Sequence, residues 1–469
     1  MRGKKRICGL LLCILLFSAC SNGEYIEQSS TESEEGSDIG ISESDVEWYP
    51  RNDAEPVGED ADWDIWGNTV SICAENNMAI TNDGILWGWG ENKWYTCATG
   101  HNTQQPEPIK VFDGVAAVSV GGGHVSALRN DGSLWLWGSN YFGQIGLDSS
   151  GAFILYPEKV MQNVSFICNS LNSIFVIDNE DQLWAWGDNS FGQIGMDAED
   201  NAVISVPVKL LDDVIYAEEY CHVMAITKEN KLLSWGSNDM GQIGNGAVTD
   251  SYHPEKVLDY VKWAYAPWTN SYAITYDDDL WMWGHYAGGK LGKGPVYEFA
   301  TEPFVILSDV ASAYDGINHA MALKTDGTLW IWGANDCGQI GDGNAGASEY
   351  QWMPKQIMDN VREASTYNSN CFAIKADNSL WAWGENQYGQ LGVGNDLQQN
   401  TPVRVMDNVH SVYQDWGHTL ILQWDGALSA CGRNSSGQLG DGTFEDRYEP
   451  VLILKDIKLP VSMKQENRS

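Results

Sequence analysis

Short apolar segments recur along most of the chain and are separated by polar turns that are rich in glycine, asparagine and aspartate. The stretch 124–138 shows the pattern, because His-Val-Ser-Ala-Leu-Arg precedes Asn130-Asp131-Gly132 and Leu-Trp-Leu-Trp-Gly follows soon after. Two short apolar runs on either side of an Asp-Gly pair are typical of a β-hairpin. The apolar residues show almost no helical spacing, so the pattern predicts an all-β chain.

The second strand of this hairpin returns along the chain at a nearly constant spacing. Eight copies resemble Leu-Trp-x-Trp-Gly, and the last has decayed to Leu-Ser-Ala-Cys-Gly. Their closing glycines are Gly90, Gly138, Gly187, Gly236, Gly284, Gly333, Gly384 and Gly432. Successive closing glycines are 48 to 51 residues apart. A period of this length indicates a repeat architecture in which each unit packs on its neighbours.

A unit of this length holds four short strands with their turns, which is one blade of a β-propeller. The two tryptophans of a motif are two residues apart and therefore lie on the same face of their strand. We expect them to fill the space between neighbouring blades. We expect the glycines to permit left-handed turns and close backbone approaches. Because 13 of the 22 tryptophans belong to the motif, their number alone is no sign of a carbohydrate site.

One complete unit resembles a known family. The segment GHVSALRNDGSLWLWGSNYFGQIG joins His-x-x-Ala-Leu, Asp-Gly, Trp-Gly and Gly-Gln-Ile-Gly, and Gly-Gln-Ile-Gly or Gly-Gln-Leu-Gly recurs in five other units. This combination is similar to the regulator of chromosome condensation (RCC1) repeat, over roughly residues 66–457. Kelch repeats have a similar period, but their paired-glycine signature is not repeated here. The resemblance implies a single β-propeller, usually of seven blades.

The number of hairpins favours eight blades, with seven as the alternative. The first unit lacks the Gly-Gln-x-Gly segment, and the fifth has Gly-Gly-Lys-Leu-Gly at 288–292. The segment 449–461 matches the outer strand of earlier units, and 68–81 could supply the inner strand that the last unit lacks. We therefore expect an eight-bladed propeller over 63–458 that is closed by N- and C-terminal strands.

Residues 1–19 are predicted to be a lipoprotein signal peptide. Basic residues precede an apolar run over 7–17 that is too short to span a bilayer as a mature helix. The run ends in Leu-Phe-Ser-Ala-Cys, which resembles the lipobox of bacterial lipoproteins except that Phe17 replaces the usual leucine. The resemblance implies lipidation at Cys20 and anchoring at the extracytoplasmic face of a bacterial membrane. An ordinary secretory signal is the alternative.

The distribution of charged residues distinguishes a predicted tether from the folded part of the chain. The net charge indicates which classes of partner are favoured. Residues 21–62 contain 14 acidic residues and one basic residue, with few apolar ones, so 20–62 is predicted to be a lipidated, disordered tether. Residues 459–469 are predicted to be a C-terminal tail. The formal net charge of the whole chain is −37. Such a chain repels phosphate backbones, so nucleic-acid binding is disfavoured, whereas basic proteins remain possible partners.

No metal, cofactor or catalytic residue is predicted. The seven cysteines after Cys20 show no paired metal-ligand spacing and lie mostly in strand-like runs, so we expect buried free thiols. The histidine position of the repeat is occupied in turn by Asn76, His124, Ser173, His222, Asn270, His319, Asn370 and His418. Because Asn and Ser alternate with His, we expect this ring to bond backbone groups rather than a metal. Carboxylates of distant blades could still meet in the central channel, and no nucleophile motif is present.

Functional residues are expected where the repeat is broken, at 92–105 and 261–272. The candidate binding residues are Trp94, Tyr95, Trp263, Tyr265 and Trp268. Exposed Trp and Tyr are common anchors of protein interfaces, and the alternative is that these residues fill gaps between irregular blades.

The leading hypothesis is a cell-surface lipoprotein whose acidic propeller binds an extracellular or envelope protein. A glycan or cell-wall binder and an envelope hydrolase are the alternatives. Nuclear members of the family exchange the nucleotide of a small GTPase and bind chromatin, and another relative is a secreted bacterial inhibitor protein of β-lactamase. Neither supplies a motif that maps onto residues of this chain, and the sequence does not fix the oligomeric state.

Overall fold

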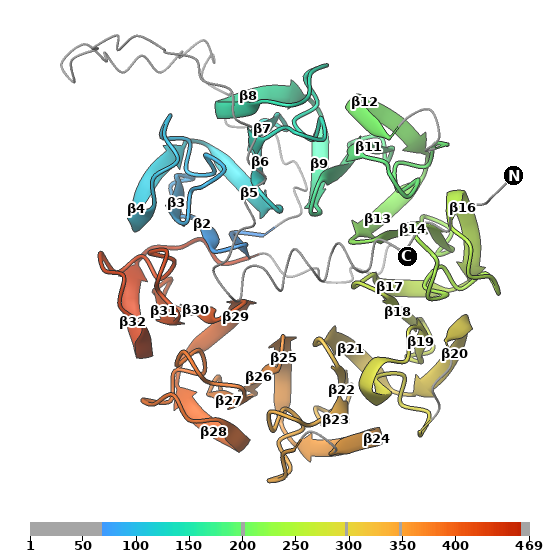
Figure 1. The fold of residues 1–469 in the computed structure, drawn as a ribbon, viewed down its shortest axis with the longest axis vertical. Helices are drawn as coiled ribbons and strands as arrows, with labels where there is room; N and C mark the ends of the chain where they lie inside the picture. The colour runs from blue at the N-terminus through green and yellow to red at the C-terminus, as the bar shows by residue number, and fades with distance from the viewer. Residues whose placement is uncertain (1–67, 198–201, 296–298, 347–348, 461–469) are drawn as a thin grey trace, which may run out of the picture. The chain divides into compact units, whose positions relative to one another are not determined.

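The computed structural model describes residues 68–460, apart from 198–201, 296–298 and 347–348. These residues belong to one compact unit, 58–469, and form eight four-stranded antiparallel sheets arranged as a ring (Figure 1). The predicted all-β propeller of eight blades is therefore confirmed, and seven blades are excluded. The predicted signal peptide 1–19, Cys20, the tether 20–62 and most of the tail 459–469 lie outside the described residues.

Each blade takes its four strands from one continuous segment, with the first strand innermost and the fourth outermost (Figure 1). The first strands are β1 (Val70–Cys73), β5 (Val115–Val120), β9 (Val164–Asn169), β13 (Val214–Glu219), β17 (Val261–Tyr265), β21 (Val310–Asp315), β25 (Val361–Tyr367) and β29 (Val409–Asp415). The second strands are β2 (Asn76–Ile80), β6 (His124–Arg129), β10 (Ser173–Asp178), β14 (His222–Thr227), β18 (Asn270–Thr275), β22 (His319–Lys324), β26 (Asn370–Lys375) and β30 (His418–Gln423).

The third strand of each blade contains the tryptophan motif, and the fourth strand forms the outer rim of the ring. The third strands are β3 (Leu86–Gly90), β7 (Leu134–Ser139), β11 (Leu183–Asp188), β15 (Leu232–Gly236), β19 (Leu280–Gly284), β23 (Leu329–Ala334), β27 (Leu380–Gly384) and β31 (Leu428–Gly432). The fourth strands are β4 (Gln105–Phe112), β8 (Phe153–Met161), β12 (Val203–Leu211), β16 (Ser251–Leu258), β20 (Ala300–Leu307), β24 (Tyr350–Met358), β28 (Gln399–Met406) and β32 (Arg447–Leu454). A short 3-10 helix, η1 (Ala287–Gly289), follows β19.

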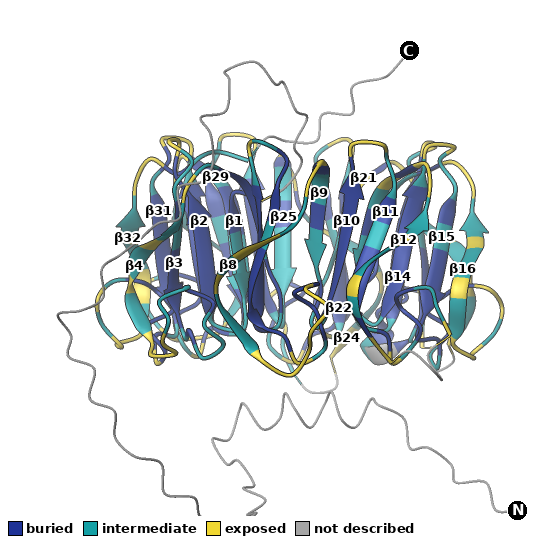
Figure 2. Ribbon diagram, turned by 90° about the horizontal axis from the view of Figure 1, so that it is seen from above, coloured by how far each residue is buried: buried dark blue, intermediate teal, exposed yellow. Residues whose placement is uncertain are grey.

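The two faces of the ring differ in their connections. Loops between the first and second strands and between the third and fourth strands leave on one face, which we call the loop face. Short Asp-Gly-type turns leave on the other. Figure 2 shows buried residues within the strands and exposed residues in the connections at both ends. No helix in the described part of the chain is long and apolar enough to cross a membrane.

The predicted hairpin turns are present. In the second blade, β6 and β7 pair His124 with Gly138, and Asp131 Oδ1 accepts the backbone N–H of Ser133 at 2.9 Å. Gly132 has a φ of 73°, which is a left-handed conformation that glycine adopts without a steric penalty. The turn and the strand register therefore follow from the same short sequence.

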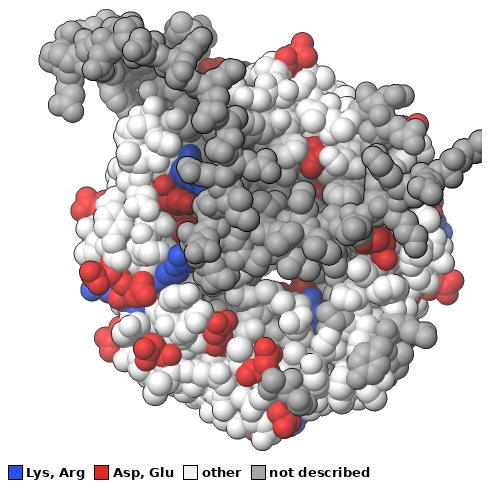
Figure 3. Space-filling model, in the orientation of Figure 1, with Lys and Arg blue, Asp and Glu red and all other residues white. Residues whose placement is uncertain are grey.

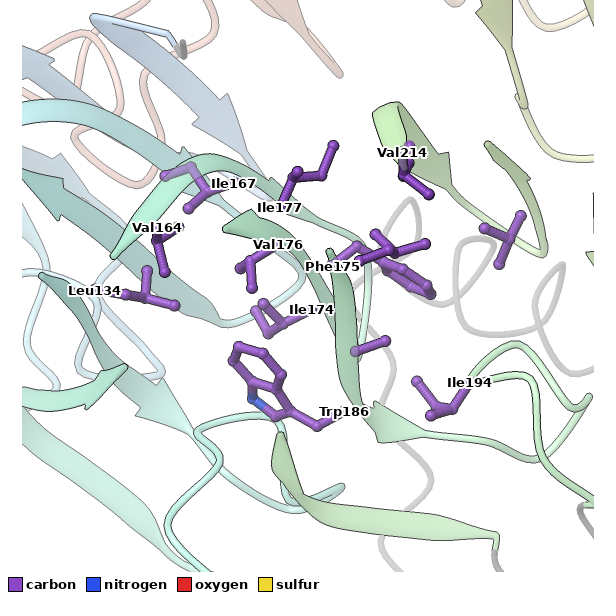
Figure 4. Packing of buried hydrophobic residues seen from close by; sticks show 14 of the residues in the cluster. Leu134, Val164, Ile167, Ile174, Phe175, Val176, Ile177, Trp186, Ile194 and Val214 are labelled. Atoms are coloured by element: carbon purple, nitrogen blue, oxygen red, sulfur yellow. The ribbon is translucent and has the colours of Figure 1, made fainter. Parts of the chain in front are cut away.

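Seven of the eight motifs have a tryptophan directly before the closing glycine, and these seven tryptophans join neighbouring blades, as the sequence predicts. These side chains have no exposed surface, and each indole N–H donates to a backbone carbonyl in the preceding blade at 2.6 to 3.1 Å. The pairs are Trp89–Gln438, Trp137–Thr96, Trp186–Gln144, Trp235–Gln193, Trp283–Gln242, Trp332–Lys290 and Trp383–Gln339. Figure 4 shows Trp186 beside Ile174 in one such junction. Burial of the ring and a satisfied N–H together fix the spacing of the blades.

Two kinds of glycine make this packing possible. A Cβ at Gly284, which closes the motif with a φ of 101°, would lie 2.4 Å from the backbone oxygen of Thr269 in the same blade. A Cβ at Gly244, in a Gly-Gln-Ile-Gly segment, would lie 2.5 Å from Nε1 of Trp283 in the next blade. Glycine therefore permits close approach of backbone to backbone within a blade and of backbone to a tryptophan ring between neighbouring blades.

The ring closes between the first and last blades without exchange of strands. The last blade consists of β29 to β32, and β1 pairs with β2 in the first blade, so the prediction that 68–81 completes the last unit is wrong. The reason is that β29 follows the outer strand β28 after a short turn, so the inner strand is already present. The two ends of the chain do meet, because Thr81 pairs with Ile457 and the N–H of Lys458 donates to the carbonyl of Ile80 at 2.8 Å.

Candidate binding site on the loop face

Six of the loops between third and fourth strands share an internal brace. In the second blade, Asn140 Oδ1 accepts the N–H of Ile145 at 2.9 Å, and Gln144 Oε1 accepts the N–H of Phe142 at 2.8 Å. The other braced loops have the pairs Asn189–Gln193, Asn238–Gln242, Asn335–Gln339, Asn386–Gln390 and Asn434–Gln438. All twelve of these side chains are buried. The loops of the first and fifth blades depart from this brace.

The loop of the first blade keeps the asparagine and loses the glutamine. Asn92 Oδ1 accepts the N–H of Cys97 at 2.8 Å, as its counterparts do, so 92–105 is a degenerate repeat loop rather than an insertion. Trp94 and Tyr95 follow in the positions where the second blade has an aromatic residue and a glycine. Tyr95 has a φ of 63°, which is uncommon for a residue with a side chain.

Trp94 and Tyr95 form an aromatic group with two residues of the second blade. The ring of Phe153 lies 5.0 Å from Tyr95, 5.9 Å from Trp94 and 5.3 Å from Tyr141, between ring centroids. Tyr141 is 49% exposed, whereas Trp94 and Tyr95 are half-buried. We call Trp94, Tyr95, Tyr141 and Phe153 the first aromatic cluster.

The loop of the fifth blade replaces both bracing residues. Tyr286 stands in place of the asparagine and Lys290 in place of the glutamine. Lys290 Nζ lies 2.7 Å from Asp315 Oδ1 on the innermost strand of the sixth blade, and the hydroxyl of Tyr272 also donates to Asp315. Burial raises the pKa of the Asp315 carboxyl, and the nearby Lys290 ammonium opposes that effect. The braced loops have at this position a neutral glutamine that accepts an N–H of its own loop, whereas Lys290 forms a charged pair with the next blade.

A second group of aromatic residues includes Tyr286 of the same loop. Tyr286 stacks on Trp352 with a centroid distance of 6.2 Å, and Tyr350 stacks on Trp352 at 4.7 Å. His285 and Phe299 lie 5.9 Å apart, and together these five residues line a cavity of about 240 Å³. We call His285, Tyr286, Phe299, Tyr350 and Trp352 the second aromatic cluster.

Comparison with known proteins places the whole architecture in a family. Residues 217–467 match the model of the RCC1-like domain, and residues 83–128 and 115–144 match models of the regulator of chromosome condensation (RCC1) repeat. The chain belongs to the RCC1-like domain family. No curated protein matches it by sequence.

Solved structures share the RCC1-like fold at low sequence identity. Prp20p from Saccharomyces cerevisiae is 17% identical, with a TM-score of 0.56, over 70% of this chain and 87% of that one. Human WBSCR16 is 18% identical, with a TM-score of 0.52, over 79% of this chain and 93% of that one. The Prp20p structure was described together with its binding to Gsp1p and histones, and another structure holds Kap60 bound to yeast RCC1 (Prp20). The likeness of this chain to these structures shows a shared fold.

The remaining sequence candidates lie elsewhere in the RCC1-like ring. Trp263 and Tyr265 on β17 are half-buried and pack against the hydrophobic core between the fifth and sixth blades. Trp268 is also half-buried, and its ring lies 4.4 Å from that of Tyr220 in the fourth blade. None of these three residues lines the cavity of the second aromatic cluster. They also do not form a single site with Trp94 and Tyr95.

The inner strands carry carboxylates toward the loop face, and each has a protein partner. Glu219 accepts a hydrogen bond from Ser173 Oγ at 2.8 Å, and Asp415 accepts one from the N–H of Glu75 at 3.0 Å. Burial raises the pKa of Glu219 to about 8. These contacts hold neighbouring blades together.

Three of the four repeat histidines bond side chains of the next blade, so the expectation of backbone partners is wrong for them, and neither ring nitrogen of the fourth, His124, has a hydrogen-bond partner among the described residues. His222 Nε2 lies 2.7 Å from Ser271 Oγ, His319 Nε2 lies 2.8 Å from Thr366 Oγ1, and His418 Nε2 lies 2.9 Å from Asn77 Oδ1. The longer imidazole reaches across the junction, whereas Asn76 donates to the backbone of its own blade. No cluster of metal-ligating side chains occurs among the described residues.

The seven described cysteines are free thiols, as predicted. Cys97, Cys371 and Cys431 are buried, and the other four are partly buried. Burial raises the pKa of the Cys371 thiol to about 12, so little thiolate forms at neutral pH.

Proposed function

We propose that this chain is a lipid-anchored protein at the extracytoplasmic face of a bacterial membrane, where its RCC1-like propeller binds another protein. The observation that carries the proposal is the departure of two loops from the repeat, each with an aromatic cluster at a blade junction on the loop face. Both clusters combine packed rings with exposed ones, since Tyr141, Phe299 and Tyr350 are 49%, 47% and 39% exposed. Partly packed aromatic rings are typical anchors of protein interfaces.

The two clusters are placed to contact one large partner. The first and fifth blades are four blades apart in either direction around a ring of eight, so the clusters lie across the ring from each other. In Figure 1, β8 of the first cluster lies at the top and β24 of the second at the bottom. A folded protein that covers the loop face would meet both clusters, whereas a small ligand would meet only one.

The charge of the chain favours a basic partner. The chain has 64 acidic residues against 27 basic ones. On the face drawn in Figure 3, Asp and Glu side chains lie around the ring, and Lys and Arg side chains are fewer. Such a field speeds association with a positively charged surface and repels nucleic acid.

The anchor is tested at Cys20. A strain that expresses the full chain should incorporate a labelled fatty acid into it and retain it in the membrane fraction. Cys20→Ser should abolish both the label and the membrane retention, because lipidation requires the thiol. Unlabelled wild-type chain, or a Cys20→Ser chain that stays with the membrane, would contradict the anchor.

Binding is tested by capture from the surface and secreted proteins of the source organism, with isolated cell wall as the parallel arm. The proposal predicts reproducible enrichment of one protein on the full chain, and weaker enrichment at high salt. Sedimentation with purified cell wall in the absence of an enriched protein would favour a glycan binder instead. Trp263→Ala is unsuited to either experiment, because Trp263 packs against the core between two blades and its loss would disturb the fold.

A further inference from the structure

The cavity of the second aromatic cluster continues into an acidic one. An adjoining cavity of about 220 Å³ is lined by Gly288, Asn318, Ala334, Asp336, Gly346, Glu349 and Tyr350. The two cavities share Gly288 and Tyr350, so they form one recess with an aromatic half and an acidic half. We infer that this recess, between the fifth and sixth blades, binds an arginine side chain of the protein partner, an inference that rests on the proposed function.

The aromatic half suits a planar cation. The ring planes of Tyr286 and Trp352 are inclined by 12°, and those of Tyr350 and Trp352 by 22°. Tyr286 is only 5% exposed, whereas Tyr350 is 39% exposed, so Tyr350 presents the accessible π face of the stack. A guanidinium group stacks on such a face through both cation–π attraction and planarity. An ammonium group has the charge without the plane.

The acidic half supplies the matching charge. Glu349 and Asp336 are both exposed at the rim of the recess, and Gln339 donates to Asp336 at 2.8 Å. Carboxylates accept the forked N–H groups of arginine with better geometry than the single ammonium of lysine. Neither set of lining residues, all of which the structure describes, contains Lys or Arg.

Basic groups near the recess do not cancel this charge. Lys290 is paired with Asp315, and Lys293 Nζ lies 3.1 Å from the ring centroid of Phe304. Burial and the nearby Lys290 ammonium lower the pKa of His285, so its imidazole is neutral at neutral pH. The recess is therefore acidic under ordinary conditions.

The aromatic half of the recess has a volume of about 240 Å³. The two glycines of the loop make this space: Gly288 has a φ of 63°, and a Cβ at Gly289 would lie 2.8 Å from Trp352. Glycine at both positions lets the loop lie directly on the tryptophan ring.

The first aromatic cluster does not offer the same site. Lys93 Nζ of the chain itself lies 5.1 Å from the ring of Trp94, so a cation already occupies that face. The fifth blade has no equivalent lysine in its aromatic half, and the arginine site is assigned to that blade alone.

The experiment is a ligand-observed NMR titration of the full chain with N-acetyl-arginine amide. N-acetyl-norleucine amide serves as the neutral probe of similar length, and N-acetyl-lysine amide as the non-planar cation. We expect saturable binding of the arginine probe, at least threefold weaker binding of the lysine probe, and no saturable binding of norleucine. Tyr350→Ala and Glu349→Gln should each weaken arginine binding at least threefold. The matched controls are Tyr276→Ala, at an exposed residue in the turn between β18 and β19 on the opposite face, and Glu445→Gln, at an exposed residue of the last blade.

The inference is overturned if the arginine probe does not bind, if norleucine binds equally well, or if neither recess variant weakens binding. Binding of cell-wall saccharides in the recess, in place of arginine, would also overturn it. Loss of arginine binding with continued capture of a protein would leave the proposed function standing. Saturable arginine binding without any captured protein would retain the recess and remove the proposed function.

Discussion

Lys290 and Asp315 form an ion pair of 2.7 Å in which each side chain is only 4% exposed. Lys290 also donates to the carbonyl of Ile317 at 3.2 Å, and the hydroxyl of Tyr272 donates to Asp315. In the six braced loops a neutral glutamine occupies the position of Lys290. A buried charge pair therefore joins the loop of the second aromatic cluster to the innermost strand of the sixth blade.

Asp315→Asn is expected to destabilise the fold strongly, because it leaves the ammonium of Lys290 buried without a counter-charge. Breaking one partner of a buried pair costs about 3–5 kcal/mol. The double variant Lys290→Gln with Asp315→Asn restores the residue of the braced loops and should recover most of that loss. Urea unfolding of the three chains measures the difference. A double variant as unstable as Asp315→Asn alone would show that the charge pair is not the cause.

Trp383→Ala is expected to cost about 3–5 kcal/mol of unfolding free energy, since it opens a cavity between two blades and leaves a carbonyl without its donor. The indole of Trp383 is fully buried and donates to the backbone of Gln339 at 2.9 Å. Phe444→Ala, at a ring that is 49% exposed, is the control and should change stability by less than about 0.5 kcal/mol. Equal effects of the two substitutions in denaturant unfolding would contradict the role of Trp383 at the junction.

Glu219→Gln is expected to remove a loss of stability at higher pH. Burial raises the pKa of Glu219 from 4.5 to about 8, so between these values the folded chain holds a proton that the unfolded chain has released. Raising the pH through this window lowers the free energy of unfolding, by up to about 1.4 kcal/mol per pH unit. The variant should gain stability relative to the wild type from about pH 5 to about pH 8 in urea unfolding. A difference that is independent of pH would refute this assignment.

His222→Asn is expected to reduce a loss of stability that occurs at low pH. Burial lowers the pKa of His222 from 6.5 to about 3. Between these two pH values the imidazole is protonated in the unfolded chain and neutral in the folded chain. Wild-type stability therefore falls as the pH decreases through this window. The variant has the residue that the next blade has at Asn270, and it should lose less stability on acidification. Parallel curves for the two chains in acid unfolding would be inconsistent with a neutral buried imidazole.

Repetition made the fold predictable from the sequence. Eight hairpins with Asp-Gly turns and regularly spaced tryptophans indicated eight blades and placed the second tryptophans, such as Trp137 and Trp186, between them. The junction of the two chain ends was also foreseen. The prediction that 68–81 completes the last unit was wrong, because β29 already supplies the inner strand of the last blade. The period of a repeat does not show at which strand each unit begins.

The site was less predictable, because it is made by contacts between blades. Trp94 and Tyr95 were visible as a break in the repeat, but their partner Phe153 belongs to the outer strand of the next blade. Tyr350 and Trp352 were missed for the same reason. The available signal was the loss of both bracing residues at Tyr286 and Lys290. Trp263 looked equally irregular in sequence, and in the structure it is half-buried and packs against the core between the fifth and sixth blades. A break in the repeat does not by itself distinguish an aromatic side chain that packs between blades from one that is available to a partner.

The most direct test of the account is the affinity of a captured protein for the full chain and for two matched variants. Tyr141→Ala with Tyr350→Ala removes one exposed ring from each aromatic cluster, whereas Tyr276→Ala removes a ring that is 54% exposed at a turn on the opposite face. If the partner is recognised through the loop face, the double variant binds at least tenfold more weakly, by about 1.4 kcal/mol or more, while Tyr276→Ala binds as the wild type does. Equal affinity of all three folded chains would contradict recognition through the loop face.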